Sequence, residues 1–110
     1  MNIRNFTPHT LALSLPNGGV LTITSEGVVR AEQTATQVGT VTILGQEMPV
    51  QEMGFGAPKG VPSLNKDDIL VVSQIAAQSI ANYFPSIAER VMIPGPLNRE
   101  TQTISVLCRL

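Results

Sequence analysis

Ser73 and Gln74 carry the clearest chemical signal in this chain, because they stand where an apolar run gives way to a helical pattern. The hydroxyl of Ser73 can accept a hydrogen bond from an amide two or three residues on, which makes it a good helix N-cap. The amides of a first helical turn have no partners within the helix, and with the helix dipole they attract an anion. The junction therefore predicts either a phosphate or carboxylate site at these two residues or a helix cap alone.

Three arginines are further candidates for anion binding, because a guanidinium group binds phosphate through two parallel hydrogen bonds. Arg30 and Arg109 lie on predicted strands, and Arg99 lies in a predicted turn. Each can instead be a surface residue or half of an ion pair. Convergence of two of them near Ser73 would indicate a binding site.

His9 and Cys108 are the only histidine and the only cysteine in the chain. A nucleophilic Cys–His pair would require the first and last strands to be neighbours, whereas a lone cysteine is commonly a small buried apolar residue. One histidine and one cysteine are too few for a zinc site, which needs three or four ligands. Asp67 and Asp68 are adjacent on a strand and point to opposite faces, so they do not form an acid–base pair. We therefore predict no catalytic residue, no metal site and no cofactor.

The length of 110 residues predicts a single domain spanning 1–110. The net charge is −1 and the seven basic residues are scattered, which argues against nucleic-acid binding. The chain lacks an apolar run of membrane-spanning length and the apolar block of a signal peptide. We expect a cytoplasmic protein with no membrane partner. Because a domain this small with few aromatic residues has a modest core, we also expect a homo-oligomer.

The elements that must position these residues begin with a central strand at 69–72, an uninterrupted apolar run typical of a strand buried on both faces. From 74 to 84 polar and apolar residues recur at helical spacing, and Pro85 should end this helix. Capping-box spacing at 86–89 predicts one short helical turn, and 91–93 reads as a strand. If the strands at 69–72 and 91–93 share a sheet, they should be parallel.

The remaining segments read as strands and turns. Residues 9–15 and 20–24 alternate in polarity around a Pro-Asn-Gly-Gly turn and predict a hairpin. A strand is expected over 28–34, a second hairpin over 38–44 and 48–53 with its turn at 45–47, and a final strand over 103–110. The Gly- and Pro-rich segment 54–66 should hold no regular element for long, and it reads as a connector or as a lid over a site. The predicted fold class is α+β, mostly β hairpins, with one main helix following a buried central strand.

Several short motifs resemble those of a group of small phage and prophage proteins. Asn5-Phe6-Thr7-Pro8-His9 is similar to their opening Asn-Leu-Thr-Pro-His motif, and the closing Cys108-Arg109 is similar to their Gly-Cys-Arg ending. Val71-Val72-Ser73 and Pro94-Gly95-Pro96 extend the likeness over most of the chain. The resemblance implies a phage origin, a host-cell location and no established enzymatic activity.

Small phage proteins of this kind often act as anti-defence factors, and one class sequesters the nucleotide signals of bacterial immunity. By this analogy we expect a non-enzymatic oligomer that binds a small anionic, nucleotide-derived ligand. The alternative is a protein-interaction or virion-associated module whose exposed strands pair with a partner, without a small-molecule ligand. The predicted ligand-binding residues are Thr7, His9, Arg30, Ser73, Gln74, Arg99 and Arg109.

Overall fold

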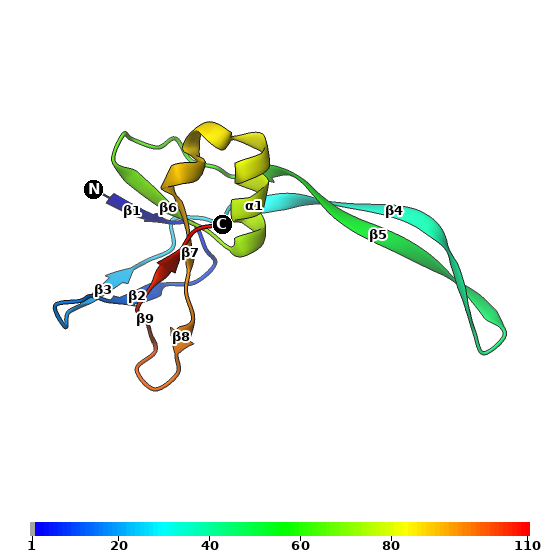
Figure 1. The fold of residues 1–110 in the computed structure, drawn as a ribbon, viewed down its shortest axis with the longest axis horizontal. Coiled ribbons are helices and arrows are strands. Elements are labelled where there is room, and N and C mark those ends of the chain that lie inside the picture. The colour runs from blue at the N-terminus through cyan, green and yellow to red at the C-terminus, as the bar shows by residue number, and fades with distance from the viewer. Residues whose placement is uncertain (1) are drawn as a thin grey trace.

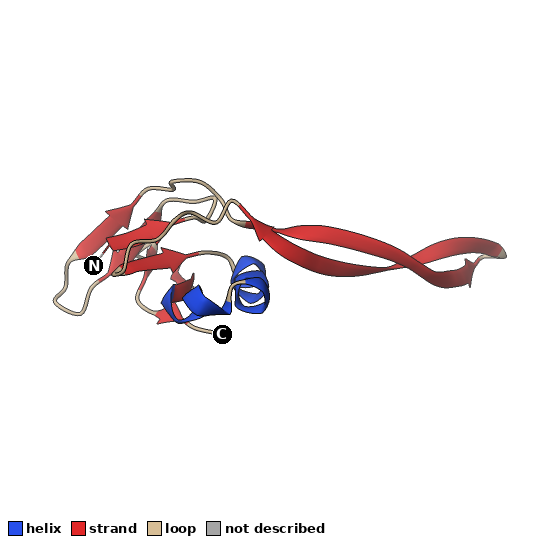
Figure 2. Cartoon of the chain, turned by 90° about the horizontal axis from the view of Figure 1, so that it is seen from above, coloured by secondary structure: helices blue, strands red, loops and turns tan. Residues whose placement is uncertain are grey.

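A computed structural model describes residues 2–110 and shows a layered body from which one long β ribbon projects (Figures 1 and 2). The body stacks a helical layer on one sheet, and a second sheet lies against the other face of the first. The molecule is 61 Å long and only 21 Å across its thinnest direction, because the ribbon extends far beyond the body. The fold is α+β and mostly β, as the sequence predicts.

The first sheet has the strand order β1-β6-β7-β10. Its first three strands are parallel, with β6 pairing β1 on one side and β7 on the other, and β10 is antiparallel to β7. The predicted parallel pairing of the strands at 69–72 and 91–93 is confirmed. Strand β1 comes from the opening residues, which the sequence left unassigned. The bounds are β1 Asn2–Asn5, β6 Asp68–Val71, β7 Val91–Pro94 and β10 Leu107–Cys108.

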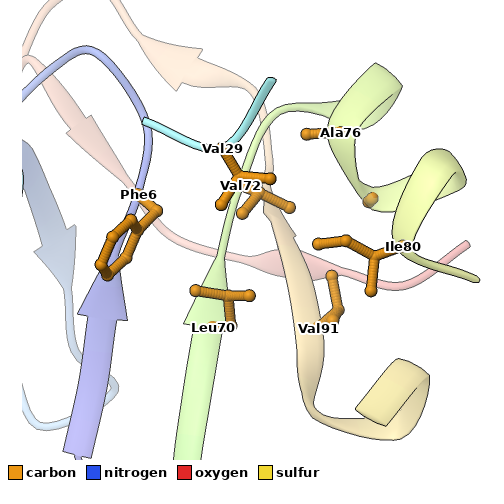
Figure 3. Packing of buried hydrophobic residues seen from close by; sticks show 8 residues of the cluster. Phe6, Val29, Leu70, Val72, Ala76, Ile80 and Val91 are labelled. Carbon is orange, nitrogen blue, oxygen red and sulfur yellow. The ribbon is translucent and has the colours of Figure 1, made fainter. Parts of the chain in front are cut away.

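The apolar run that includes β6 is the centre of the molecule, and its side chains alternate between two cores. Leu70 and Val72 are completely buried toward the helix, where they meet Val29, Ile80 and Val91 (Figure 3). Val71 is also completely buried, but it belongs to the cluster shared with the second sheet. Because successive side chains on a strand point to opposite faces, an unbroken apolar run is what a strand covered on both sides requires. The prediction of a buried central strand is confirmed.

The helical layer consists of α1 (Gln74–Tyr83) and the short 3-10 helix η1 (Pro85–Arg90). Ser73 caps α1, and the chain leaves helical geometry at Phe84, immediately before Pro85. Both predictions, the helix and the short turn after Pro85, are confirmed. Helix α1 covers the first sheet through Ala76, Ala77 and Ile80, whose small or branched side chains let the helix pack close to the sheet. Figure 3 shows Ala76 and Ile80 on the side of the helix that faces the core.

The second sheet has the order β3-β2-β9-β8. Strands β2 and β3 form the predicted first hairpin, and β9 joins β2 in parallel. Leu11, Leu13 and Ile104 are buried between the two sheets with Val71. The predicted single strand over 103–110 is wrong, because the chain crosses at 105–106 from this sheet to the first one. The bounds are β2 Leu11–Ser14, β3 Val20–Ile23, β8 Leu97–Asn98 and β9 Thr103–Ile104.

The projecting ribbon, which we name the arm, is the antiparallel pair β4 (Arg30–Ile43) and β5 (Gln46–Lys59). It leaves the body beside α1, where the Ser79 hydroxyl donates to the Gly56 carbonyl at 2.6 Å. Gly60 follows with φ +85, and a Cβ there would lie 2.8 Å from the Val28 carbonyl oxygen, so only glycine fits this exit. The far end of the arm lies away from the body in both views (Figures 1 and 2).

The arm corrects three sequence-based expectations. The predicted strand at 28–34 and the hairpin at 38–53 are parts of one longer hairpin, because residues 35–37 continue β4. The prediction that 54–66 holds no regular element is wrong, because 54–59 belong to β5. The turn lies at Leu44 and Gly45, both with positive φ as a two-residue hairpin turn requires, rather than at 45–47.

Asp68, at the start of β6, has a buried carboxylate. Its side chain is 2% exposed, accepts from the Asn65 amide at 2.9 Å and lies 3.3 Å from the Arg4 guanidinium. Arg4 also donates to Glu26 at 2.9 Å. The Asn65 amide first, and then Arg4, hold the pKa of Asp68 below its usual range, because both favour the ionised carboxylate.

This lowered pKa predicts an acid-sensitive contribution to stability. The contribution is present above the pKa of an unfolded aspartate, about 3.9, and is lost as the pH falls through the lower folded pKa. Chemical unfolding measured between pH 7 and pH 2 should show this loss below about pH 4. Asp68→Asn should remove this part of the acid transition, with Asp67→Asn at the exposed neighbouring position as the matched control. An identical acid transition in wild type and Asp68→Asn would contradict the assignment.

Candidate functional site

The carboxyl ends of three parallel strands meet at one edge of the first sheet, and a cavity of about 510 Å³ lies beside this edge. The segment after β1 supplies Thr7 and His9, the residue after the β6 run is Ser73, and β7 ends at Pro94. Open sheets with parallel strands generally bind ligands outside these carboxyl ends. The volume falls within the range of small-molecule sites, about 300–1,000 Å³.

Asn5 holds the loop that carries His9 at the cavity. Its fully buried side chain donates to the carbonyls of His9 at 2.8 Å and Ile23 at 3.0 Å. Its oxygen accepts from the Thr7 amide at 3.0 Å and from the Thr7 hydroxyl at 2.7 Å. The opening motif is therefore a network of hydrogen bonds that fixes a tight loop. Thr7 lines the cavity, but its hydroxyl is already engaged within this network.

Ser73 lines the cavity at the start of α1. Its hydroxyl accepts from the Ala76 amide at 3.4 Å, so the predicted cap is confirmed. The first turn of the helix consists of Gln74, Ile75 and Ala76, all uncharged. The positive end of the helix dipole is thus not offset by a carboxylate within its own first turn, which leaves it favourable for a ligand anion.

The cavity wall is mostly apolar and includes residues that the sequence reading did not select. Thr10 and Gln102 add polar groups to those of His9 and Ser73, and the other new members are Pro8, Leu11, Ala12, Pro94, Leu97 and Ile104. The signal that could have found part of this wall is Pro94-Gly95-Pro96 at the end of a predicted parallel strand. Residues from β9 and the turn before it could not be found this way, because β9 joins the second sheet only through tertiary pairing with β2.

Gln74 and Arg109 line a second cavity, of about 430 Å³, which Pro94 also lines. Pro94 borders both cavities, and Ser73 and Gln74 are consecutive, so the two lie next to each other around the start of α1. The structure therefore brings Thr7, His9 and Ser73 into one cavity and places Gln74 and Arg109 in its neighbour.

The other two predicted arginines lie elsewhere. Arg30 is exposed at the base of the arm, opposite Lys59. Arg99 is exposed in the turn between β8 and β9, where its carbonyl accepts from the Gln102 side chain at 2.9 Å. Arg99 does not line the cavity and contacts the lining residue Gln102 through its backbone carbonyl, and Arg30 belongs to a different part of the molecule.

His9 and Cys108 line different cavities, His9 the larger one and Cys108 the smaller one. His9 lies in the bend before β2, and Cys108 lies in β10. Because β2 and β10 belong to different sheets, the strand pairing that a Cys–His pair requires is not present between them. Within residues 2–110, no group of three or more His, Cys, Asp or Glu side chains gathers in a way that could hold a metal ion. Neither described helix combines the length and hydropathy needed to cross a membrane.

This arrangement suits a molecule with one flat apolar part and one anionic part. The apolar wall can contact the first part, and the helix start without carboxylates and the adjacent arginine can attract the second. Comparison of the chain with protein-family models, curated proteins and solved structures found no match.

Proposed function

We propose that the protein binds a small anionic, nucleotide-derived ligand at the carboxyl edge of strands β1, β6 and β7, without converting it chemically. The observation that carries the proposal is the cavity at this edge, which opens at the start of α1 beside Ser73. The base would lie against the apolar wall, and the phosphate would accept hydrogen bonds at the helix start. Arg109, in the adjoining cavity, supplies the nearby positive charge for a ligand that extends past Pro94.

Binding without turnover is the simplest chemistry for these residues. Ser73 serves as a helix cap, and His9 and Cys108 line different cavities. The opening motif resembles that of small phage proteins, and in a phage protein such binding would sequester a nucleotide signal of host immunity. The proposed ligands are accordingly cyclic nucleotides and ADP-ribose derivatives.

Ser73→Asp tests the anion site while keeping the helix cap, because aspartate caps a helix as well as serine does. The added carboxylate should repel the ligand anion and weaken binding by about tenfold or more. The measurement is isothermal titration calorimetry of the purified chain with cyclic nucleotides and ADP-ribose. Ser63→Asp places the same charge on an exposed loop residue and should leave the affinity unchanged.

Two results would contradict the proposed function. One is wild-type protein that releases or absorbs no heat with any of these compounds at high micromolar concentration. The other is equal affinity of the Ser73→Asp variant and wild type, which would place binding away from the start of α1. Thermal unfolding of both variants checks that each remains folded.

The arm favours a second candidate function, that of a protein-interaction or virion-associated module. Its two strands are exposed along most of their length, unlike the central strand β6 of the body. A pull-down from lysogenic cells, followed by protein and small-molecule mass spectrometry, separates the two functions. A defined protein partner with no co-purifying nucleotide would favour the interaction module.

A further inference from the structure

The arm leaves this chain with far more surface than a compact domain of its mass has. The solvent-accessible surface is 7576 Å², whereas a compact monomer of 11.7 kDa exposes about 5,900 Å². The radius of gyration is 18.0 Å, against about 13 Å for a compact domain of this length. The excess of roughly 1,700 Å² comes from both faces and the full length of the arm, so a contact through one face can bury only a part of it.

The distal half of the arm carries an apolar face. Paired residues on antiparallel strands place their side chains on the same face of the ribbon. Val41 pairs with Met48, Gly39 pairs with Val50, and Ile43 pairs with Gln46. We name Val41, Ile43, Met48 and Val50 the distal apolar face; these side chains are 39–50% exposed.

The opposite face of the same half is polar. Thr42 pairs with Glu47 and Thr40 pairs with Pro49, and these positions alternate with those of the distal apolar face. Such alternation is typical of a ribbon that is covered on one face and solvated on the other. An isolated two-stranded ribbon is at best marginally stable in water, so the uncovered apolar face needs a partner.

The charges favour a second copy of this chain as that partner. From Gln33 to Gln51 the sequence contains a single charged residue, Glu47, and it lies on the polar face. Neither the four residues of the distal apolar face nor the residues paired with them carry a charge, so two copies of this face can approach each other without bringing like charges together. Glu52 lies beyond the face, two residues after Val50 on β5. A nucleic acid or other polyanion would find no basic group along this stretch.

Strand addition at the outer edge of β5 is disfavoured, because Pro49 has no amide hydrogen to donate. Association through the face avoids this restriction. Two ribbons packed face to face form a two-layer β sandwich, the arrangement by which sheets normally bury apolar faces.

We propose that the arm is a dimerisation element, in which the distal apolar face packs against the same face of a second copy about a two-fold axis. Both subunits then contribute identical residues, so one substitution acts twice in each dimer. The body and its cavities remain outside this contact, since the far end of the arm lies away from them (Figures 1 and 2).

The test compares two double variants on β4 that carry the same added charge on opposite faces. Val41→Lys with Ile43→Lys places two ammonium groups on the distal apolar face, and Thr40→Lys with Thr42→Lys places them on the polar face. Sedimentation equilibrium of wild-type protein should give twice the chain mass of 11.7 kDa. The apolar-face variant should sediment as a monomer, with its dissociation constant raised at least about 100-fold, and the polar-face variant should remain dimeric.

Cysteine cross-linking provides a second measurement that does not depend on removing the contact. In a Cys108→Ser background, which removes the only native thiol, Val41→Cys should form a covalent dimer on mild oxidation. Thr40→Cys, one residue away on the polar face, should stay monomeric on a denaturing gel. Far-ultraviolet circular dichroism checks that each variant retains its strands.

Several outcomes would overturn the proposal. Wild-type protein that remains monomeric at all concentrations excludes it, as does a doubled mass in the Val41→Lys, Ile43→Lys variant. Equal cross-linking at positions 40 and 41 excludes this face as the contact. A monomeric wild type that captures a different protein through the same residues would replace the second copy with that protein.

Discussion

Asn5→Ala is expected to lower the free energy of unfolding by about 4 kcal/mol. The buried side chain makes two donor and two acceptor contacts, with His9, Ile23 and Thr7. Alanine removes all four contacts in a site where Asn5 is 0% exposed, and of their partners the Thr7 hydroxyl and the His9 carbonyl keep a hydrogen bond, to each other at 3.1 Å. For a domain with a total stability of about 5–15 kcal/mol, this is a large loss. Urea unfolding monitored by circular dichroism measures it.

Two further substitutions serve as comparisons for Asn5→Ala. Asn5→Asp keeps the acceptor contacts to Thr7 but cannot donate to the two carbonyls, so it should also destabilise the fold. Asn82→Ala, at an exposed position of α1, should change stability by less than about 0.5 kcal/mol. A loss for Asn5→Ala no larger than that for Asn82→Ala would show that the network contributes little.

Leu70→Ala is expected to cost about 3 kcal/mol, because it removes a large side chain from the centre of the core. Leu70 is completely buried between the helical layer and the first sheet (Figure 3). Val29, Ile80 and Val91 come from different elements and cannot all move to fill the cavity left behind. The measurement is the same urea unfolding experiment. The dependence of the free energy of unfolding on urea concentration is compared between variant and wild type, because a change in this slope would indicate a change in the unfolded state.

Leu44→Ala is the matched control for Leu70→Ala. Leu44 is 98% exposed at the turn of the arm, so the same chemical change there removes almost no buried contact. Its effect on stability should be within about 0.5 kcal/mol. Equal effects at the two leucines would contradict the position of β6 at the centre of the fold.

The central part of the fold was predictable because local and tertiary signals agree there. The apolar run at 69–72 specifies the central strand. The cap at Ser73 and the stop at Pro85 specify the two ends of the helix that follows, and the structure contains both elements. The first hairpin was predictable for the same reason, since its turn and its alternating strands point to one arrangement.

The full length of the arm and the division of the final segment into two strands could not be predicted from local patterns. Gly54 and Pro58 are residues that normally interrupt a strand, yet both lie in β5, where pairing with β4 imposes the extended conformation. The final segment alternates as one strand would, but it is divided between two sheets because each half finds a different neighbour. Such choices depend on contacts between segments distant in sequence.

The candidate site was partly predictable. Ser73 could be located from the strand–helix junction, and His9 from a motif, but their meeting in one cavity depends on the parallel pairing of β1 with β6. No local pattern specifies that pairing. Gln102 shows the limit most clearly, because it reaches the cavity from a turn that reads as an ordinary polar connection.

The most direct test of the account is a nuclear magnetic resonance titration of ¹⁵N-labelled protein with ADP-ribose and cyclic nucleotides. Ligand binding at the carboxyl edge of the first sheet should shift the amide signals of Thr10, Ser73, Gln74 and Gln102, and leave those of the distal arm unchanged. Shifts confined to other parts of the molecule, or no shifts at millimolar ligand, would contradict the proposed site.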